Sequence, residues 1–250
     1  MEKEPNKITK TFNNIFDFLF KSHRCICCGS ECDSETKYRI CSRCNKKITY
    51  SFDNHTCLRC GSVISGDYDF CLTCKDREYE FDKARSVFAY NDITAPMILN
   101  FKYNGLKSYA KDFAHMLHMV YSSSDLIFDS VTYVPMPEER QRKRGYNQSY
   151  ELCKEFSLLS GVPMIDALKR TNNISKQSTL NANQRAENIK GSFMIADKSL
   201  VKNREILIID DVMTTGATAN ECAKVLIKNG ARNVSVLTIA KTPTKNLDKN

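Results

Sequence analysis

From residue 81 onward, short apolar runs of strand length alternate with segments of helical periodicity. The strand-length runs are RSVFAY (85–90), VTYVP (131–135), EILIID (205–210) and VSVLTIA (234–240), and the helical segments lie near 94–104, 108–122, 145–160 and 218–229. Strands that alternate with helices predict βαβ units and a mostly parallel sheet, an α/β fold. The continuous apolar run at 206–209 is typical of a central strand that is buried on both faces.

The chain divides into three regions by this pattern. Residues 1–20 contain an amphipathic helix over 8–20, which we expect to pack on the protein itself, with a membrane surface or a partner protein as the alternative. Residues 21–80 are polar, rich in cysteine and short of apolar runs, so a hydrophobic core alone cannot stabilise them and another source of folding stability is needed. Residues 81–250 carry the alternating pattern of the α/β domain.

Composition is typical of a globular protein and indicates the cellular compartment in which the chain is expected. Hydrophobic residues make up 42% and charged residues 26%, and the formal net charge of +8 permits an anionic partner. No run approaches the ~20 apolar residues that span a bilayer, and the first residues lack the apolar core of a secretory signal. We therefore expect a cytoplasmic protein, with a peripheral position at the inner face of the membrane as the alternative. Of its 12 cysteines, ten lie between Cys25 and Cys74, and in a reducing compartment such density favours metal over disulfides.

The cysteines form four C-x-x-C knuckles, and glycine follows the first and third, so the unit CxxCG…CxxC occurs twice. Two knuckles supply the four sulfurs of a tetrahedral zinc site. The predicted ligands are Cys25 and Cys28 with Cys41 and Cys44, and Cys57 and Cys60 with Cys71 and Cys74. An interleaved pairing or a single occupied site is the alternative arrangement. Redox dithiols, an iron–sulfur cluster and unligated thiols are the alternative chemistries.

The remaining cysteines and histidines of the amino-terminal half are less informative than the knuckles. Cys27 and Cys32 have no assigned role, and His23 or His55 could replace a cysteine ligand. His115 and His118 share one helix face, where we expect a structural role.

The segment 206-ILIIDDVMTTGAT-218 carries the clearest chemical motif. An apolar strand ends in Asp210 and Asp211, and a loop of small residues, Thr214, Thr215, Gly216, Ala217 and Thr218, leads into a helix. Ligands of open α/β sheets bind beyond the carboxyl ends of the strands, and loop N–H groups at a helix start form a seat for phosphate. The two carboxylates suit a sugar diol or a metal-bound sugar. A Walker A loop is excluded because no Gly-Lys-Ser/Thr follows.

Two polar segments could add cations to this site. Residues 134–149 run from a strand end into a basic loop, and residues 169–193 form a poorly periodic segment that could close over a pyrophosphate. The candidate anion-binding residues are Arg140, Arg142, Lys143, Arg144, Gln177 and Arg185. A solvated charged face is the alternative interpretation of residues 140–144.

The motif at 206–218 resembles the phosphoribosyl pyrophosphate (PRPP) loop of type I phosphoribosyltransferases. The order of motifs is similar to that of the ComF/GntX-like family: cysteine knuckles, FKYNG (101–105), RGYNQS (144–149), Q-x-x-L…R-x-x-N-x-x-G-x-F (177–193) and the PRPP-type loop. The resemblance spans about residues 16–241. It implies a type I phosphoribosyltransferase-like sheet behind an amino-terminal zinc ribbon. It also implies that Asp210 and Asp211 hold ribose hydroxyls, that residues 214–218 hold the 5′-phosphate, and that Mg²⁺ accompanies PRPP.

The same resemblance implies a role in natural competence. Members of this family are associated with the handling of single-stranded transforming DNA, alongside a helicase-like partner and recombination proteins. The candidate DNA-binding residues of the ribbon are Lys37, Arg39, Arg43, Lys46, Lys47, Tyr50 and Arg59, because basic residues track a strand and rings stack on bases. An active phosphoribosyltransferase acting on a nucleobase or amine is the alternative, and control of DNA binding by PRPP or a 5′-phosphate is a hybrid of the two.

Overall fold

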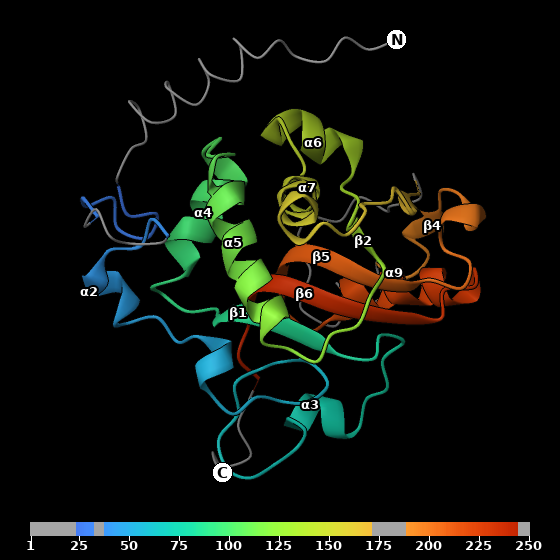
Figure 1. Cartoon of the computed structure of the whole chain (residues 1–250), viewed down its shortest axis with the longest axis horizontal. Helices are drawn as coiled ribbons and strands as arrows, with labels where there is room; N and C mark the ends of the chain where they lie inside the picture. Colours follow the sequence, from blue (N-terminus) through green and yellow to red (C-terminus); the bar gives the residue numbers. More distant parts are fainter. Residues whose placement is uncertain (1–23, 33–37, 172–188, 245–250) are drawn as a thin grey trace.

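The computed structural model describes residues 24–32, 38–171 and 189–244. Its centre is a four-stranded sheet in the order β1-β6-β5-β2, in which every pairing is parallel (Figure 1). The strands are β1 (Ala84–Ala89), β2 (Ser130–Tyr133), β5 (Glu205–Met213) and β6 (Asn233–Lys241). The predicted parallel α/β fold is confirmed, and each of the four apolar runs became one strand of this sheet.

The central strand β5 divides the protein core into two parts. Ile206 and Ile208 belong to one buried cluster, whereas Leu207 and Ile209 belong to the other, because successive side chains of a strand point to opposite faces. All four are at most 1% exposed, which confirms a strand buried on both faces.

Helices cover both faces of the sheet. The core that contains Leu207 lies under α4 (Ala95–Tyr103), α5 (Tyr109–Ser122) and α7 (Gln148–Ser160), and the core that contains Ile206 lies under α9 (Ala217–Lys228). These four helices correspond to the predicted helical segments. Figure 1 shows α4, α5 and α7 on one side of the sheet and the turn around α3 (Leu72–Lys75) on the other.

Sequence periodicity missed three kinds of short element. The basic segment after β2 is the helix α6 (Glu138–Arg144), not the predicted loop. Glu138 and Glu139 stand in its first turn and Arg142, Lys143 and Arg144 in its last, a distribution that favours a helix through its dipole. Strands β3 (Leu168–Arg170) and β4 (Phe193–Ile195) form an antiparallel pair, and η1 (Ser51–Asp53) and η2 (Lys198–Leu200) are single turns.

The cysteine-rich region contributes to both cores, one on each face of the sheet. Cys25, Cys41 and Cys44 belong to the core under α4, α5 and α7. Cys41 is the N-cap of the short helix α2 (Ser42–Asn45), and Cys44 is its buried residue. The four cysteines from Cys57 to Cys74 belong to the opposite core. The helix predicted over 8–20 lies outside the described residues, and among the helices within them none has the length and apolar character to cross a membrane.

Candidate functional site

The predicted phosphate loop, residues 214–218, follows β5 (Glu205–Met213) and includes the first two residues of α9, Ala217 and Thr218. β5 does not end at Asp210 as the sequence suggested but continues to Met213, because β6 pairs with it as far as Lys241. Gly216 then precedes the first residue of α9 with φ of +78°, a conformation that glycine accepts and other residues resist. A Cβ at this position would also lie 3.1 Å from the ring of Tyr79. Glycine is therefore required here both by the backbone and by its neighbour.

The acidic pair lies just before this loop and is held by specific partners. Asp211, which is buried, forms an ion pair of 2.9 Å with the Nζ atom of Lys102. Asp210 accepts a hydrogen bond of 2.6 Å from the hydroxyl of Ser149 and one of 2.9 Å from the backbone N–H of Asp211. Burial, and then the neighbouring charge of Asp211, raises the pKa of Asp210 to about 7. The pair therefore combines a carboxylate that is ion-paired with Lys102 and one whose pKa lies near neutral pH.

The motifs FKYNG and RGYNQS hold the partners of the acidic pair in place. The hydroxyl of Tyr146 donates to the carbonyl of Phe101, and the amide of Gln148 donates to the carbonyl of Lys102 at 3.3 Å. Arg144 bonds to Gln148 at 2.7 Å and stacks over the ring of Tyr103 at 4.7 Å. These contacts fix α4 against the start of α7 and so place Lys102 and Ser149 beside the carboxylates.

Lys102, Gln148 and Ser149 contact or position the acidic pair and are candidate site residues that sequence reasoning did not single out. Their motifs served only to identify a family. A local signal was present, because Lys102 lies in the last turn of α4 and Ser149 in the first turn of α7, and both helices pack on the same core.

The predicted basic residues separate into three groups. Arg140, Arg142 and Lys143 are exposed on α6, and Lys143 pairs with Glu139 at 3.2 Å. Arg144 makes contacts within the protein, the hydrogen bond to Gln148 and the stacking on Tyr103. Gln177 and Arg185 lie outside the described residues.

Arg170, at the end of β3, is a further cation on this side of the molecule. Its guanidinium stacks over Phe193 at 4.8 Å, and its Nε is the one buried side-chain nitrogen or oxygen within the described ranges that makes no hydrogen bond. Burial, and then the charge of Arg140, lowers the pKa of Arg170. The guanidinium groups of Arg140 and Arg170 thus repel each other, and Arg170 lies at the start of the segment 169–193 that was predicted to close over a pyrophosphate.

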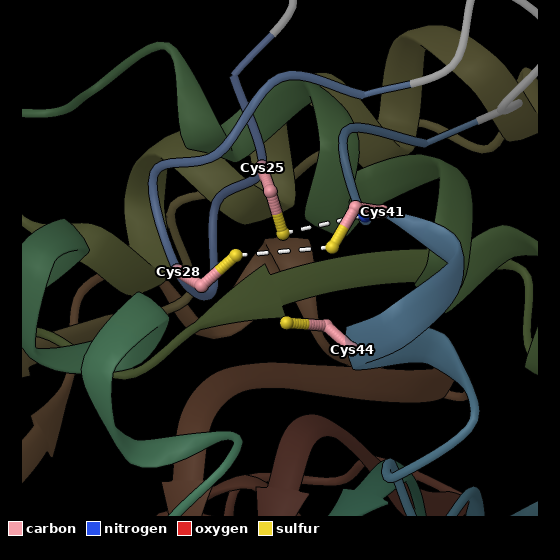
Figure 2. Close-up of side chains that lie close together, drawn as sticks. All are labelled: Cys25, Cys28, Cys41 and Cys44. Atoms are coloured by element: carbon pink, nitrogen blue, oxygen red, sulfur yellow. Dashed lines mark hydrogen bonds between the residues drawn. The ribbon is translucent and has the colours of Figure 1, made fainter.

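The eight predicted metal ligands form two groups of four sulfurs. The first cluster is Cys25, Cys28, Cys41 and Cys44 (Figure 2), and the second cluster is Cys57, Cys60, Cys71 and Cys74; within each, the sulfur atoms lie within 4.8 Å of one another. The sulfurs are grouped as in the predicted pairing and not as in the interleaved one.

The spacing of the sulfurs fits a tetrahedral ion. Cys28 and Cys41 are separated by 3.8 Å, and Cys60 and Cys71 by 3.7 Å. Four zinc–sulfur bonds of ~2.3 Å place sulfurs ~3.8 Å apart, whereas a disulfide needs ~2.05 Å. Figure 2 shows the four sulfurs of the first cluster converging on one point, with the N–H of Cys41 donating to the sulfur of Cys25 at 3.3 Å. Both clusters can therefore hold zinc.

The two clusters repeat the same local structure. In the first, Cys25 N–H donates to the carbonyl of Ser30 and Gly29 N–H to that of Cys25; in the second, Cys57 N–H donates to Ser62 and Gly61 N–H to Cys57. The repeated CxxCG…CxxC unit of the sequence is thus a repeated fold. Gly61 has the stricter role, because a Cβ there would lie 2.6 Å from the carbonyl oxygen of Ala84 in β1.

Cys27, His55 and His118 belong to neither group of four sulfurs. Cys27 contacts the sulfur of Met97 at 3.6 Å, and burial raises its thiol pKa, so it fills space in the core as a neutral thiol. His55 bonds to the carbonyl of Tyr68, and the ring of His118 packs near Phe156. His23 is outside the described residues.

The candidate DNA-binding residues differ in how accessible they are. Arg39 forms an ion pair with Asp112 at 2.5 Å, Tyr50 packs on Phe88, and Arg59 bonds to the carbonyl of Phe81. Three others are exposed around α2: Arg43, Lys46 and Lys47. Lys37 is outside the described residues.

Known proteins resemble this chain along most of its length. Residues 143–250 match the family described as the phosphoribosyl transferase domain. Competence protein F of Haemophilus influenzae is 29% identical over 235 residues, 91% of this chain and 99% of the relative. DNA utilization protein YhgH of Escherichia coli K12 is 28% identical over 90% of this chain and 93% of the relative. Competence protein ComFC of Bacillus subtilis is 29% identical over 63% of this chain and 64% of the relative.

Metal analysis should find about two zinc ions per chain, because each cluster offers four sulfurs at tetrahedral spacing. Cys28→Ser and Cys60→Ser should each retain about one ion, since each removes a ligand from only one cluster. Inductively coupled plasma mass spectrometry of the purified full chain measures this. A single ion in the unmodified protein, or the visible absorbance of an iron–sulfur cluster, would contradict the assignment.

Replacing the two aspartates by asparagine should have opposite effects on stability. The pKa of Asp210 is about 7 in the folded protein and ~3.9 when unfolded, so its ionisation costs stability as the pH rises between these values. Asp210→Asn should therefore raise the melting temperature, and more at pH 8 than at pH 5. Each pH unit in that range corresponds to at most ~1.4 kcal/mol.

Asp211→Asn is the matched comparison and should lower the melting temperature, because it leaves the ammonium of Lys102 without its partner. Differential scanning fluorimetry at the two pH values measures both variants. Equal destabilisation by both substitutions would show that the acidic pair is not arranged as described.

Proposed function

Since this chain belongs to the ComF family of phosphoribosyltransferase-related competence proteins, we propose that it binds a 5′-phosphorylated ribose at residues 210–218 and handles single-stranded DNA. The ligand is PRPP or the 5′-phosphate of a nucleotide. The observation that carries the proposal is the acidic pair followed by a glycine-centred loop at the start of α9. That arrangement offers oxygen acceptors for ribose hydroxyls next to N–H donors for a phosphate.

Each part of the site has a role in this proposal. Asp210 and Asp211 accept hydrogen bonds from the ribose hydroxyls, and Lys102 orients Asp211 and adds positive charge at the entrance. The residues from Thr214 to Thr218 hold the phosphate, with Gly216 allowing its close approach. The exposed cations of α6 attract the remaining negative charge of the ligand.

Magnesium fits the same donor set. Carboxylate oxygens and phosphate oxygens are the ligands that Mg²⁺ prefers, and Mg²⁺ would neutralise charge between a pyrophosphate and the acidic pair. Because the pKa of Asp210 is about 7, its carboxylate is available to a cation or a diol more fully above neutral pH than below it.

The DNA-handling part of the proposal depends on the exposed cations around the first cluster. Arg43, Lys46 and Lys47 are exposed on or next to α2, where they have room to contact a phosphodiester backbone. Arg43 also donates to the sulfur of Cys28 at 3.8 Å and to the hydroxyl of Ser30 at 3.4 Å. Arg39, Tyr50 and Arg59 are less exposed and make contacts within the protein, so we assign them a structural role. The name "DNA utilization protein" of the E. coli relative supports this direction. Helicase-like and recombination proteins as partners, in the cytoplasm, complete the proposal.

An active phosphoribosyltransferase is the second candidate. It is favoured by the full set of groups at the site, because the charges of Lys102, Arg140 and Arg170 could stabilise a departing pyrophosphate. The acceptor in that case is a nucleobase or an amine. Release of pyrophosphate from Mg²⁺–PRPP in the presence of an acceptor separates this candidate from binding alone.

Two titrations on the zinc-loaded full chain test the proposed function. Fluorescence anisotropy should show that labelled single-stranded DNA binds and that its affinity falls steeply with salt, by ~0.7 in the log–log slope for each phosphate contacted. Lys46→Gln with Lys47→Gln should weaken this binding several-fold and leave Mg²⁺–PRPP affinity, measured by calorimetry, unchanged.

The double variant Asp210→Asn, Asp211→Asn should give the reverse pattern, with PRPP binding lost and most DNA affinity kept. Addition of PRPP should displace 5′-phosphorylated DNA more than 5′-hydroxyl DNA if the strand end occupies the loop. Absence of DNA binding at low salt would contradict DNA handling as an intrinsic activity. Absence of PRPP binding would contradict the assignment of a ribose-phosphate site.

A further inference from the structure

Two successive carbonyl groups of the phosphate loop accept hydrogen bonds from side chains outside the loop. The Nζ of Lys241 donates to the carbonyl of Thr214 at 2.8 Å, and the hydroxyl of Tyr79 donates to that of Thr215 at 3.1 Å. The C=O and N–H groups of a trans peptide point in opposite directions. The N–H groups of Thr215 and Gly216 therefore point away from Lys241 and Tyr79, where they can face a ligand.

Lys241 is buried beside the second cluster. It is 3% exposed, and within the described ranges no carboxylate lies at ion-pair distance from it. Burial lowers the pKa of its ammonium, and the negative charge of the four cluster sulfurs opposes that shift. A zinc ion bound by four thiolates has a formal net charge of about −2. The loaded cluster would thus supply the counter-charge that this buried lysine otherwise lacks.

The chain beyond Lys241 is attached to the same cluster. The backbone N–H and the hydroxyl of Thr244 both lie 3.2 Å from the hydroxyl oxygen of Ser62. The carbonyl of Ser62 in turn accepts the N–H of the ligand Cys57 at 2.9 Å. Lys241, the last residue of β6, is consequently followed by a segment that is anchored beside the second cluster.

Tyr79 reaches the loop from the other end of the second cluster. It follows the last ligand, Cys74, by a short segment, and its ring packs on Phe81 with the centroids 4.7 Å apart. The next residue, Glu80, donates its N–H to the side chain of Asn220 in α9 at 2.6 Å. The segment after the cluster is thereby fixed to both the loop and the helix that follows it.

We propose that Lys241 and Tyr79 are positioning residues that hold the phosphate loop in its ligand-binding form and make that form depend on the second cysteine cluster, not on the first. The inference rests on the proposed function, since a phosphate is the ligand that this loop would hold. The first cluster packs in the opposite core, and no hydrogen bond among the described residues joins it to residues 214–218. The two similar clusters thus have different consequences for the site.

Hydrogen–deuterium exchange of the unliganded, zinc-loaded full chain tests this directly. Tyr79→Phe removes the hydroxyl and keeps the ring, and it should raise exchange in peptides covering 212–220 by about two- to tenfold, the effect of one lost hydrogen bond. Tyr68→Phe is the matched control, the same change on an exposed tyrosine near the same cluster, and should exchange like the unmodified protein. Lys241→Met should act in the same direction as Tyr79→Phe.

The dependence on one cluster is tested by the same readout. Cys60→Ser should raise exchange in the loop, whereas Cys28→Ser should not. Mg²⁺–PRPP affinity by calorimetry should fall in Tyr79→Phe while its zinc content stays unchanged. Loop exchange that is unaltered in Tyr79→Phe and Lys241→Met, or altered equally by the two cysteine variants, would overturn the proposal. If the unmodified protein binds no PRPP, the proposed function fails, and the exchange data still decide the positioning role.

Discussion

Two adjacent carboxylates on a buried strand repel each other and lose hydration, and the rest of the site is built around that constraint. Asp210 and Asp211 follow an apolar run that lies at the centre of the sheet, where solvent screens charge poorly. The ion pair with Lys102 compensates one charge, and the bond from Ser149 together with a raised pKa accommodates the other. An arrangement that costs stability in the free protein is consistent with a site whose carboxylates serve a ligand.

The partners of the acidic pair come from two helices that the chain reaches at distant positions. Lys102 lies in the last turn of α4 and Ser149 in the first turn of α7. The bonds from Tyr146 and Gln148 to the end of α4 set their positions. Tyr79, in the segment after the second cluster, and Lys241, at the end of β6, donate hydrogen bonds to the loop itself. The acidic half of the site therefore depends on helix packing, and the phosphate half depends on a candidate metal cluster.

The sequence was most informative where one residue pattern permits one structure. The four apolar runs predicted the sheet, because strands buried on both faces need continuous apolar residues. A C-x-x-C turn brings its own two thiols together, and the repeated unit CxxCG…CxxC predicted which two knuckles meet. By contrast, α6 contains no apolar periodicity, so its basic residues looked like a loop.

Contacts between distant segments could not be read from local patterns. Nothing near Lys241 in the sequence indicates that its ammonium bonds to the carbonyl of Thr214, and nothing near Arg39 indicates its pair with Asp112. Arg39, Tyr50 and Arg59 therefore looked like surface residues available to DNA, whereas the fold uses them internally.

Phosphorus-31 NMR of Mg²⁺–PRPP titrated with the zinc-loaded protein tests the central claim most directly, because the 5′-phosphate and the pyrophosphate give separate resonances. The account predicts that the 5′-phosphate resonance shifts or broadens with saturation, and that the double variant Asp210→Asn, Asp211→Asn abolishes the change. A 5′-phosphate resonance that is unaffected by excess protein would contradict the assignment of residues 210–218 as a ribose-phosphate site.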